Sequence, residues 1–123
     1  MILTFPIVGA FYRPPAKALL AVLPVGTPLI LCAEPDNPAD PNAIAVWLLT
    51  ASIPDTSLAV LDGELGAFGK TLSDVVDMES HHVGYIPKEV AAKLRYDGFP
   101  VQTSVPGTFS CTTSGAPMVR FEL

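Results

Sequence analysis

A small, mainly β domain of the α+β class is the fold that this sequence predicts. The chain of 123 residues contains 13 prolines and nine glycines. A proline content about twice the usual 5% disfavours long helices and favours short strands joined by fixed turns. Half of the residues are apolar, which suffices to fill one core without a metal or a disulfide. A chain of this length forms one domain, so we expect residues 1–123 to form a single domain.

Two apolar segments open the chain. Residues 4–12 have the composition of a first strand, and the pair Pro14-Pro15 ends it. Residues 16–23 are predicted to form a short helix, because proline is accepted in a first helical turn and the apolar side chains can share one face. Pro24 ends that helix.

A loop of unusual composition joins the next two strands. Residues 29–34 and 43–49 are apolar and strand-like, and residues 34–42 between them are dense in proline, aspartate and asparagine. Proline fixes φ, and Asx side chains bond their own backbone. The loop therefore holds its side chains ready for a ligand, although a plain hairpin turn fits the same composition.

Residues 50–82 are interpreted as an acidic insertion. They contain six acidic residues against the single base Lys70, whereas the rest of the chain has six of each sign. The net charge of −5 therefore belongs to this segment, and a nucleic-acid surface elsewhere is compatible with it, although a large basic field is missing. Mixed periodicity fits a hairpin plus a short helix, or a partly mobile excursion. The insertion either shields a binding pocket or is itself the working surface.

Regular patterning resumes after the insertion. Residues 82–86 form a short strand, and residues 88–96 form a helix with one apolar face. Strands over 99–113 and 118–121 complete the sheet, with turns at Pro106-Gly107 and Ser114-Gly115.

The sequence shows no sign of export or membrane insertion. The apolar stretch 18–33 is interrupted by two prolines and a glycine, and no basic segment precedes a cleavage-like site. We therefore expect a cytoplasmic protein with no membrane partner. Cys32 and Cys111 lie in apolar, strand-like segments, which predicts buried structural thiols.

Catalytic motifs are weak. The segment Gly63-x5-Gly69-Lys70-Thr71 has five residues between its glycines, where a phosphate-binding loop needs four. His81 and His82 point to opposite faces of a strand, which makes them poor joint metal ligands. We expect a protein that is not an enzyme and that holds neither a metal nor a cofactor.

Three segments, taken together, resemble the HIRAN domain family. They are Ile7-Val8-Gly9, Pro38-x-Asp40-x-Asn42-Ala43-Ile44-Ala45-Val46 and Val83-Gly84-Tyr85-Ile86-Pro87-Lys88-Glu89-Val90-Ala91. The resemblance runs from Phe5 to about Gly98. It implies a small OB/SH3-like β-barrel with two short helices, of a kind found attached to DNA translocases or standing alone in bacteria and phages.

The resemblance also implies a function. In the best understood members of the family, the pocket captures a 3′ end of single-stranded DNA, with an aromatic ring stacked on the end bases and a loop aspartate accepting a hydrogen bond from the free 3′-hydroxyl. A carboxylate at this place accepts a hydroxyl donor and repels a 3′-phosphate. By position, Tyr12 matches the stacking aromatic and Asp40 the carboxylate, and Asn37 and Asn42 frame the loop.

Three further residues join this candidate site. Tyr85 falls beside the pocket, Lys88 begins a helix whose amino end can face a phosphate, and Arg13 is the nearest additional cation. Structural alternatives stay open for the site residues. Tyr12 and Tyr85 also fit half-buried barrel positions, Asn42 also fits a residue that only makes the turn, and Lys88 also fits a solvated surface.

Two departures from the family pattern predict weak DNA binding. Ala39 stands where DNA-end binders carry a second stacking aromatic, and Phe11 stands where a basic residue precedes the stacking tyrosine. Stacking of one base on an aromatic side chain contributes about 1 to 3 kcal/mol. Loss of one such side chain therefore weakens DNA binding by roughly one to two powers of ten. The leading hypothesis is thus a weak module for single-stranded DNA ends that acts with a DNA-processing protein.

The alternative is a protein-interaction or inhibitor module. In this hypothesis a phage or mobile-element factor uses the acidic insertion to dock on a nucleic-acid-processing enzyme. A folded remnant without a ligand also fits the composition, and the sequence leaves the oligomeric state open.

Overall fold

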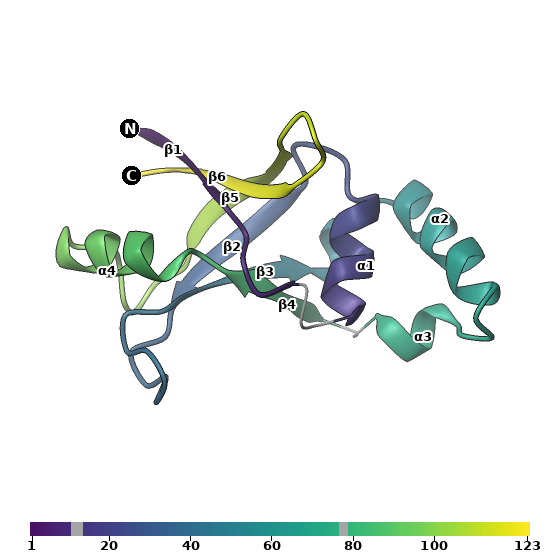
Figure 1. The fold of residues 1–123 in the computed structure, drawn as a ribbon, viewed down its shortest axis with the longest axis horizontal. Helices are drawn as coiled ribbons and strands as arrows, with labels where there is room; N and C mark the ends of the chain where they lie inside the picture. The colour runs from purple at the N-terminus through teal and green to yellow at the C-terminus, as the bar shows by residue number, and fades with distance from the viewer. Residues whose placement is uncertain (11–13, 77–78) are drawn as a thin grey trace.

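An antiparallel sheet of six strands forms the centre of the molecule (Figure 1). The computed structural model describes residues 1–10, 14–76 and 79–123. The order of the strands across the sheet is β1-β6-β5-β2-β3-β4, so β1 and β4 are its edges. The strands are β1 (Ile2–Pro6), β2 (Pro28–Ala33), β3 (Ile44–Leu49), β4 (Ser80–Tyr85), β5 (Val105–Cys111) and β6 (Pro117–Glu122).

Short helices lie at the two ends of this sheet. The helices are α1 (Pro14–Val22), the 3-10 turn η2 (Thr50–Ser52), α2 (Asp55–Gly66), α3 (Leu72–Val75) and α4 (Lys88–Tyr96). The mainly β class with short helices is confirmed, and α1 and α4 match the two predicted helices. Within the described residues, no helix has the length and apolar character needed to cross a membrane.

The predicted closure into an OB/SH3-like barrel is wrong, because the sheet stays open. β1 ends at Pro6, and proline has no backbone N–H with which to extend a ladder. Beyond it, one isolated bridge joins Val8 to Tyr85 of β4. The first strand is therefore shorter than the predicted 4–12, and residues 11 and 12 lie outside the described residues.

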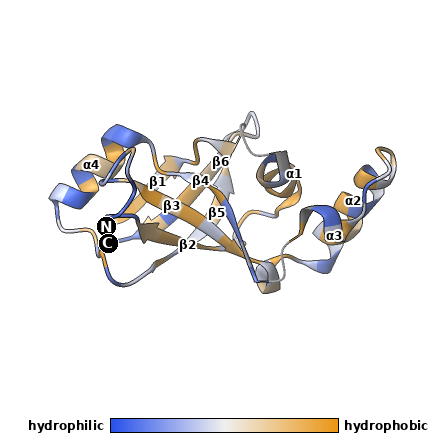
Figure 2. Ribbon diagram, turned by 90° about the horizontal axis from the view of Figure 1, so that it is seen from below, coloured by the Kyte–Doolittle hydropathy of each residue, from blue (hydrophilic) through white to orange (hydrophobic). Residues whose placement is uncertain are grey.

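One face of the sheet carries the core. Leu31 of β2 and Ile44, Val46 and Leu48 of β3 have no exposed surface, and neither has Leu19 of α1. Figure 2 shows this apolar character along the central strands, with hydrophilic segments on the helices at both ends. Burial alternates only in the second half of β3, where Trp47 is half-buried and Leu49 is exposed, and this part defines an inner face and an outer face.

The predicted turn at Pro106-Gly107 is wrong, because both residues lie within β5 and pair with β2. A Cβ atom on Gly107 would lie 2.9 Å from Leu31 Cδ1 and 3.0 Å from the Arg120 carbonyl oxygen. Gly107 thus allows the Leu31 side chain and the Arg120 backbone to pack closely against β5. The turn at Ser114-Gly115 is confirmed, with a positive φ of 88° at Gly115.

The described part of the acidic segment 50–82 contains η2, α2 and α3 and ends in the first residues of β4, so the predicted hairpin is wrong. Leu61 and Leu65 of α2 are buried, and the Ser57 hydroxyl donates a 2.7 Å hydrogen bond to the Val22 carbonyl of α1. A capping box between Thr71 and Asp74 begins α3. In Figure 1, α2 and α3 lie at the opposite end of the sheet from the β2–β3 loop, so they do not cover that loop.

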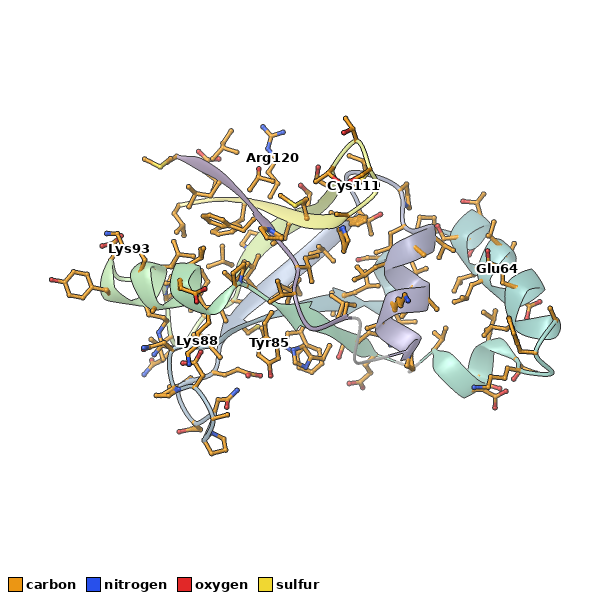
Figure 3. The ribbon with its side chains drawn as sticks, viewed as in Figure 1. Glu64, Tyr85, Lys88, Lys93, Cys111 and Arg120 are labelled. Atoms are coloured by element: carbon orange, nitrogen blue, oxygen red, sulfur yellow. The ribbon has the colours of Figure 1, made fainter. Side chains whose placement is uncertain are left out.

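The two thiols differ in exposure. Cys32 is half-buried, but Cys111 is exposed, which corrects the prediction that both are buried. Cys111 is the last residue of β5 and lies beside the β5–β6 turn (Figure 3), beyond the part of the strand that packs on the core.

We expect iodoacetamide to alkylate Cys111 faster than Cys32 at mildly alkaline pH. Burial, and secondly the Glu34 carboxylate, raise the pKa of the Cys32 thiol, which lowers the fraction of reactive thiolate at a given pH. Mass spectrometry of the two peptides over time measures both rates, and the urea-unfolded chain is the control in which the rates converge. Faster labelling of Cys32 in the folded protein would contradict this prediction.

Candidate nucleic-acid interface

A cavity of about 310 Å³ lies where the β2–β3 loop, the end of β4 and the start of α4 meet. Its lining residues are Val8, Asn37, Ala39, Asp40, Ala43, Tyr85, Ile86 and Lys88. Figure 3 shows Tyr85 and Lys88 on the same side of the molecule, next to this loop. Four of the seven residues predicted for the site are therefore brought together.

Asn37 organises the loop from within. Its Oδ1 atom accepts hydrogen bonds from the backbone N–H groups of Ala39, at 2.9 Å, and Asp40, at 3.2 Å. Its Nδ2 atom donates to Glu34 Oε1 at 3.0 Å. These hydrogen bonds from the asparagine side chain satisfy backbone N–H groups of the loop that are not paired in the sheet. They support the prediction that the loop is rigid.

Asp40 presents one carboxylate oxygen to the loop and keeps the other available. Oδ1 accepts a 3.0 Å hydrogen bond from the Asn42 backbone N–H. Among the described residues, Oδ2 has no hydrogen-bond partner. Asn42 thus supports the carboxylate through its backbone, and its exposed side chain does not line the cavity.

A hydrogen bond joins helix α4 to the β2–β3 loop. The Arg95 guanidinium donates a 2.8 Å hydrogen bond to the Pro41 carbonyl oxygen. At the other end of the helix, Lys88 lines the cavity. Helix α4 thus supplies one hydrogen bond to the loop and one lysine side chain to the cavity.

The opposite wall depends on a close approach of two backbone segments. Val8 and Tyr85 exchange both backbone hydrogen bonds, each 2.8 Å long. Beside this bridge, a Cβ on Gly84 would lie 2.6 Å from Ile7 Cγ2 and 2.6 Å from the Val8 carbonyl oxygen. Only glycine permits this contact, which places Val8 and Tyr85 on one wall.

The Tyr85 ring is fixed by an aromatic neighbour. The His82 and Tyr85 ring centroids are 4.6 Å apart, with the rings at 83° to each other, which is an edge-to-face contact. His82 Nε2 forms a 2.9 Å hydrogen bond with the Gly84 carbonyl oxygen. The half-buried Tyr85 is thus a positioned wall of the cavity.

Two predicted site residues, Tyr12 and Arg13, lie outside the described residues, as does Phe11. Arg95 and His82 were not predicted for the site, and they act on the cavity through a backbone carbonyl and through Tyr85. No signal in the sequence points to this role of His82, because residues three apart in a regular strand point to opposite faces and the contact depends on the irregular register of β3 and β4.

The structure is thus a small β-domain in which the β2–β3 loop, β4 and α4 together form a cavity lined by a carboxylate, a tyrosine and a lysine. The family model of the HIRAN domain matches residues 3–96. The chain belongs to the HIRAN domain family, a family of DNA-binding domains, which supports nucleic-acid binding for this protein. Searches of the curated proteins and of the solved structures returned no match.

Proposed function

We propose that this chain is a non-enzymatic module that binds single-stranded DNA at its 3′-hydroxyl end. The observation that carries the proposal is the state of Asp40, whose Oδ1 is held by the Asn42 N–H while Oδ2 has no partner among the described residues. A carboxylate oxygen in this state accepts a hydrogen bond from a hydroxyl. A terminal phosphate would instead bring a second negative charge against it.

The rest of the cavity suits a nucleotide. Tyr85 offers an aromatic surface to a base or sugar, and Lys88, which has no ion-pair partner among the described residues, offers a charge to a phosphate at the start of α4. The loop bonds are present before a ligand arrives, which lowers the entropic cost of binding. Tyr12 remains the proposed stacking residue and Arg13 a proposed cation, on their positions in the sequence.

The proposed affinity is weak. Ala39 lines the cavity and is exposed, and its small methyl group offers no stacking surface at the position where the family pattern has a second aromatic ring. Attachment to a DNA-processing protein would offset this loss, because a tethered module acts at a high effective concentration.

We expect Asp40→Asn to lower the affinity for a 3′-hydroxyl oligonucleotide about tenfold, which is the lower end for a hydrogen bond to a charged group. The same substitution should remove discrimination against the oligonucleotide ending in a 3′-phosphate, because the repelling charge is gone. Fluorescence anisotropy of the two labelled oligonucleotides, titrated at low salt, measures both effects.

Asp36→Asn is the matched control. Asp36 is an exposed acid of the same loop and does not line the cavity, so its substitution makes the same change in net charge without touching the site. Equal binding of the two oligonucleotides by the unsubstituted protein, or equal effects of the two substitutions, would contradict the proposal.

A second candidate is docking of the acidic segment on a nucleic-acid-processing enzyme, as in a phage or mobile-element inhibitor. The observation that favours it is the exposed Phe68, 82% exposed, next to the acidic helix α2. Figure 3 shows Glu64 of α2 far from Tyr85 and Lys88, so the two functions use different surfaces. An acidic decoy tolerates replacement of Asp40 and fails when the acids at 74, 77 and 79 are neutralised.

A further inference from the structure

The outer face of the sheet carries a strip of three aromatic rings that begins at the cavity. Tyr85 lines the cavity, His82 precedes it along β4, and Trp47 lies beside His82 on β3. The indole of Trp47 and the imidazole of His82 are stacked, with centroids 5.0 Å apart and an angle of 21° between the planes. We call Trp47, His82 and Tyr85 the aromatic strip.

A register shift puts these rings on one face. Residues three apart in a regular strand point to opposite faces, yet His82 and Tyr85 are in contact. The β3–β4 pairing is irregular between Val46 and Trp47, and the extra residue on β4 brings both side chains to the same side. The bulge thus joins a ring of the cavity wall to rings farther along the sheet.

The strip is open to solvent in part, since Trp47, His82 and Tyr85 are each half-buried, although Ala45 on the same face of β3 is fully buried. Ile44, Val46 and Leu48 are fully buried, but Trp47 is half-buried. On β2, Ile30 pairs with Trp47 and is also half-buried. Single-stranded nucleic acids stack their bases on partly exposed aromatic side chains, and the faces of Trp47 and His82 that are not stacked on each other suit such a contact.

We propose that Trp47 and His82 extend the binding site, so that the nucleotides preceding the 3′ end lie along the aromatic strip with their bases against these rings. This inference rests on the proposed function of the cavity. No residue of the strip carries a fixed positive charge, so this part of the site recognises bases by stacking and adds few phosphate contacts. The preferred ligand is therefore a single-stranded end several nucleotides long and not a mononucleotide.

The test uses 3′-hydroxyl oligothymidylates of increasing length, from a dinucleotide to a hexanucleotide, with two readouts. Affinity should rise about tenfold over the first added nucleotides, as expected for one stacked base, and then level off. Trp47 is the only tryptophan of the chain, so its emission should change on saturation with the longer oligomers and stay constant with the dinucleotide.

Substitutions separate the strip from the cavity. Trp47→Leu should abolish the tenfold gain with length and keep the preference for a 3′-hydroxyl, and Trp47→Phe should restore most of the gain. Tyr96→Ala is the control, because that ring is 88% exposed on α4 and lies outside the strip. Circular dichroism and urea unfolding establish that each variant is folded.

The outcomes distinguish the two proposals. If unsubstituted protein prefers the 3′-hydroxyl but shows no gain with length and no change in Trp47 emission, the aromatic strip is overturned and the cavity stands. A gain with length that survives in folded Trp47→Leu overturns the strip as well. If no oligomer binds, or binding ignores the 3′-hydroxyl, the proposed function itself fails.

Discussion

Replacing Gly84 with alanine is expected to destabilise the fold by about 3 kcal/mol, at the upper end for a core overpacking change. The new methyl group would meet Ile7 Cγ2 and the Val8 carbonyl oxygen at 2.6 Å each, and the φ of 155° is one that side-chain-bearing residues rarely adopt. Since the Val8 carbonyl is backbone, β4 and the segment after β1 must separate. Urea unfolding followed by Trp47 emission measures the loss of stability.

Gly63→Ala is the matched control for that substitution. Gly63 lies on the exposed face of α2, and no atom lies within 4 Å of the position that an added Cβ would take. Alanine there should stabilise the protein by about 0.5 to 1 kcal/mol, because glycine is costly inside a helix. Equal stability of the Gly84 and Gly63 variants would show that the close approach of Val8 to Gly84 does not limit the fold.

Truncating Leu61 to alanine is expected to cost about 3 kcal/mol, within the usual range for a buried leucine. Leu61 is 1% exposed and lies on α2, which packs on α1 through the Ser57–Val22 hydrogen bond. If α2 folds together with the sheet, a reporter on β3 detects this loss. The measurement is the urea midpoint reported by Trp47 emission, which comes from a residue outside α2.

Val60→Ala serves as the control, because Val60 is the preceding residue of α2 and is 53% exposed. Its truncation should change stability by less than about 0.5 kcal/mol. An unchanged Trp47 transition in Leu61→Ala would mean that the acidic segment folds separately from the sheet. That result would favour its interpretation as an added docking surface.

Local patterning predicted the elements well where their signals were unambiguous. The helix at 88–96 follows Pro87 and has one apolar face, and it was found with those bounds. Pro106-Gly107 has the composition of a turn, but the glycine is required by contact with Leu31, a residue distant in sequence. Whether the sheet closes into a barrel likewise depends on pairing between its two edge strands, β1 and β4. These strands are far apart in the sequence, so local patterns do not predict their pairing.

The residues of the candidate site also divide into those that local motifs predicted and those that depend on contacts between strands. Asn37, Asp40, Tyr85 and Lys88 were predicted through two motifs and line one cavity. Trp47 was not predicted for the site, because its position beside His82 depends on an irregular register between β3 and β4. Such a shift has no signature in either strand alone.

The hydrogen bond from Arg95 to the Pro41 carbonyl has a consequence for how this domain can vary. Its acceptor is a main-chain atom, so any residue that keeps the loop backbone in place can occupy position 41. Position 95 is more constrained, because the donor must be a side chain long enough to reach this carbonyl from α4. We therefore expect position 41 to vary among related chains while position 95 keeps a long donor, so that this contact between residues 54 positions apart produces no covariation.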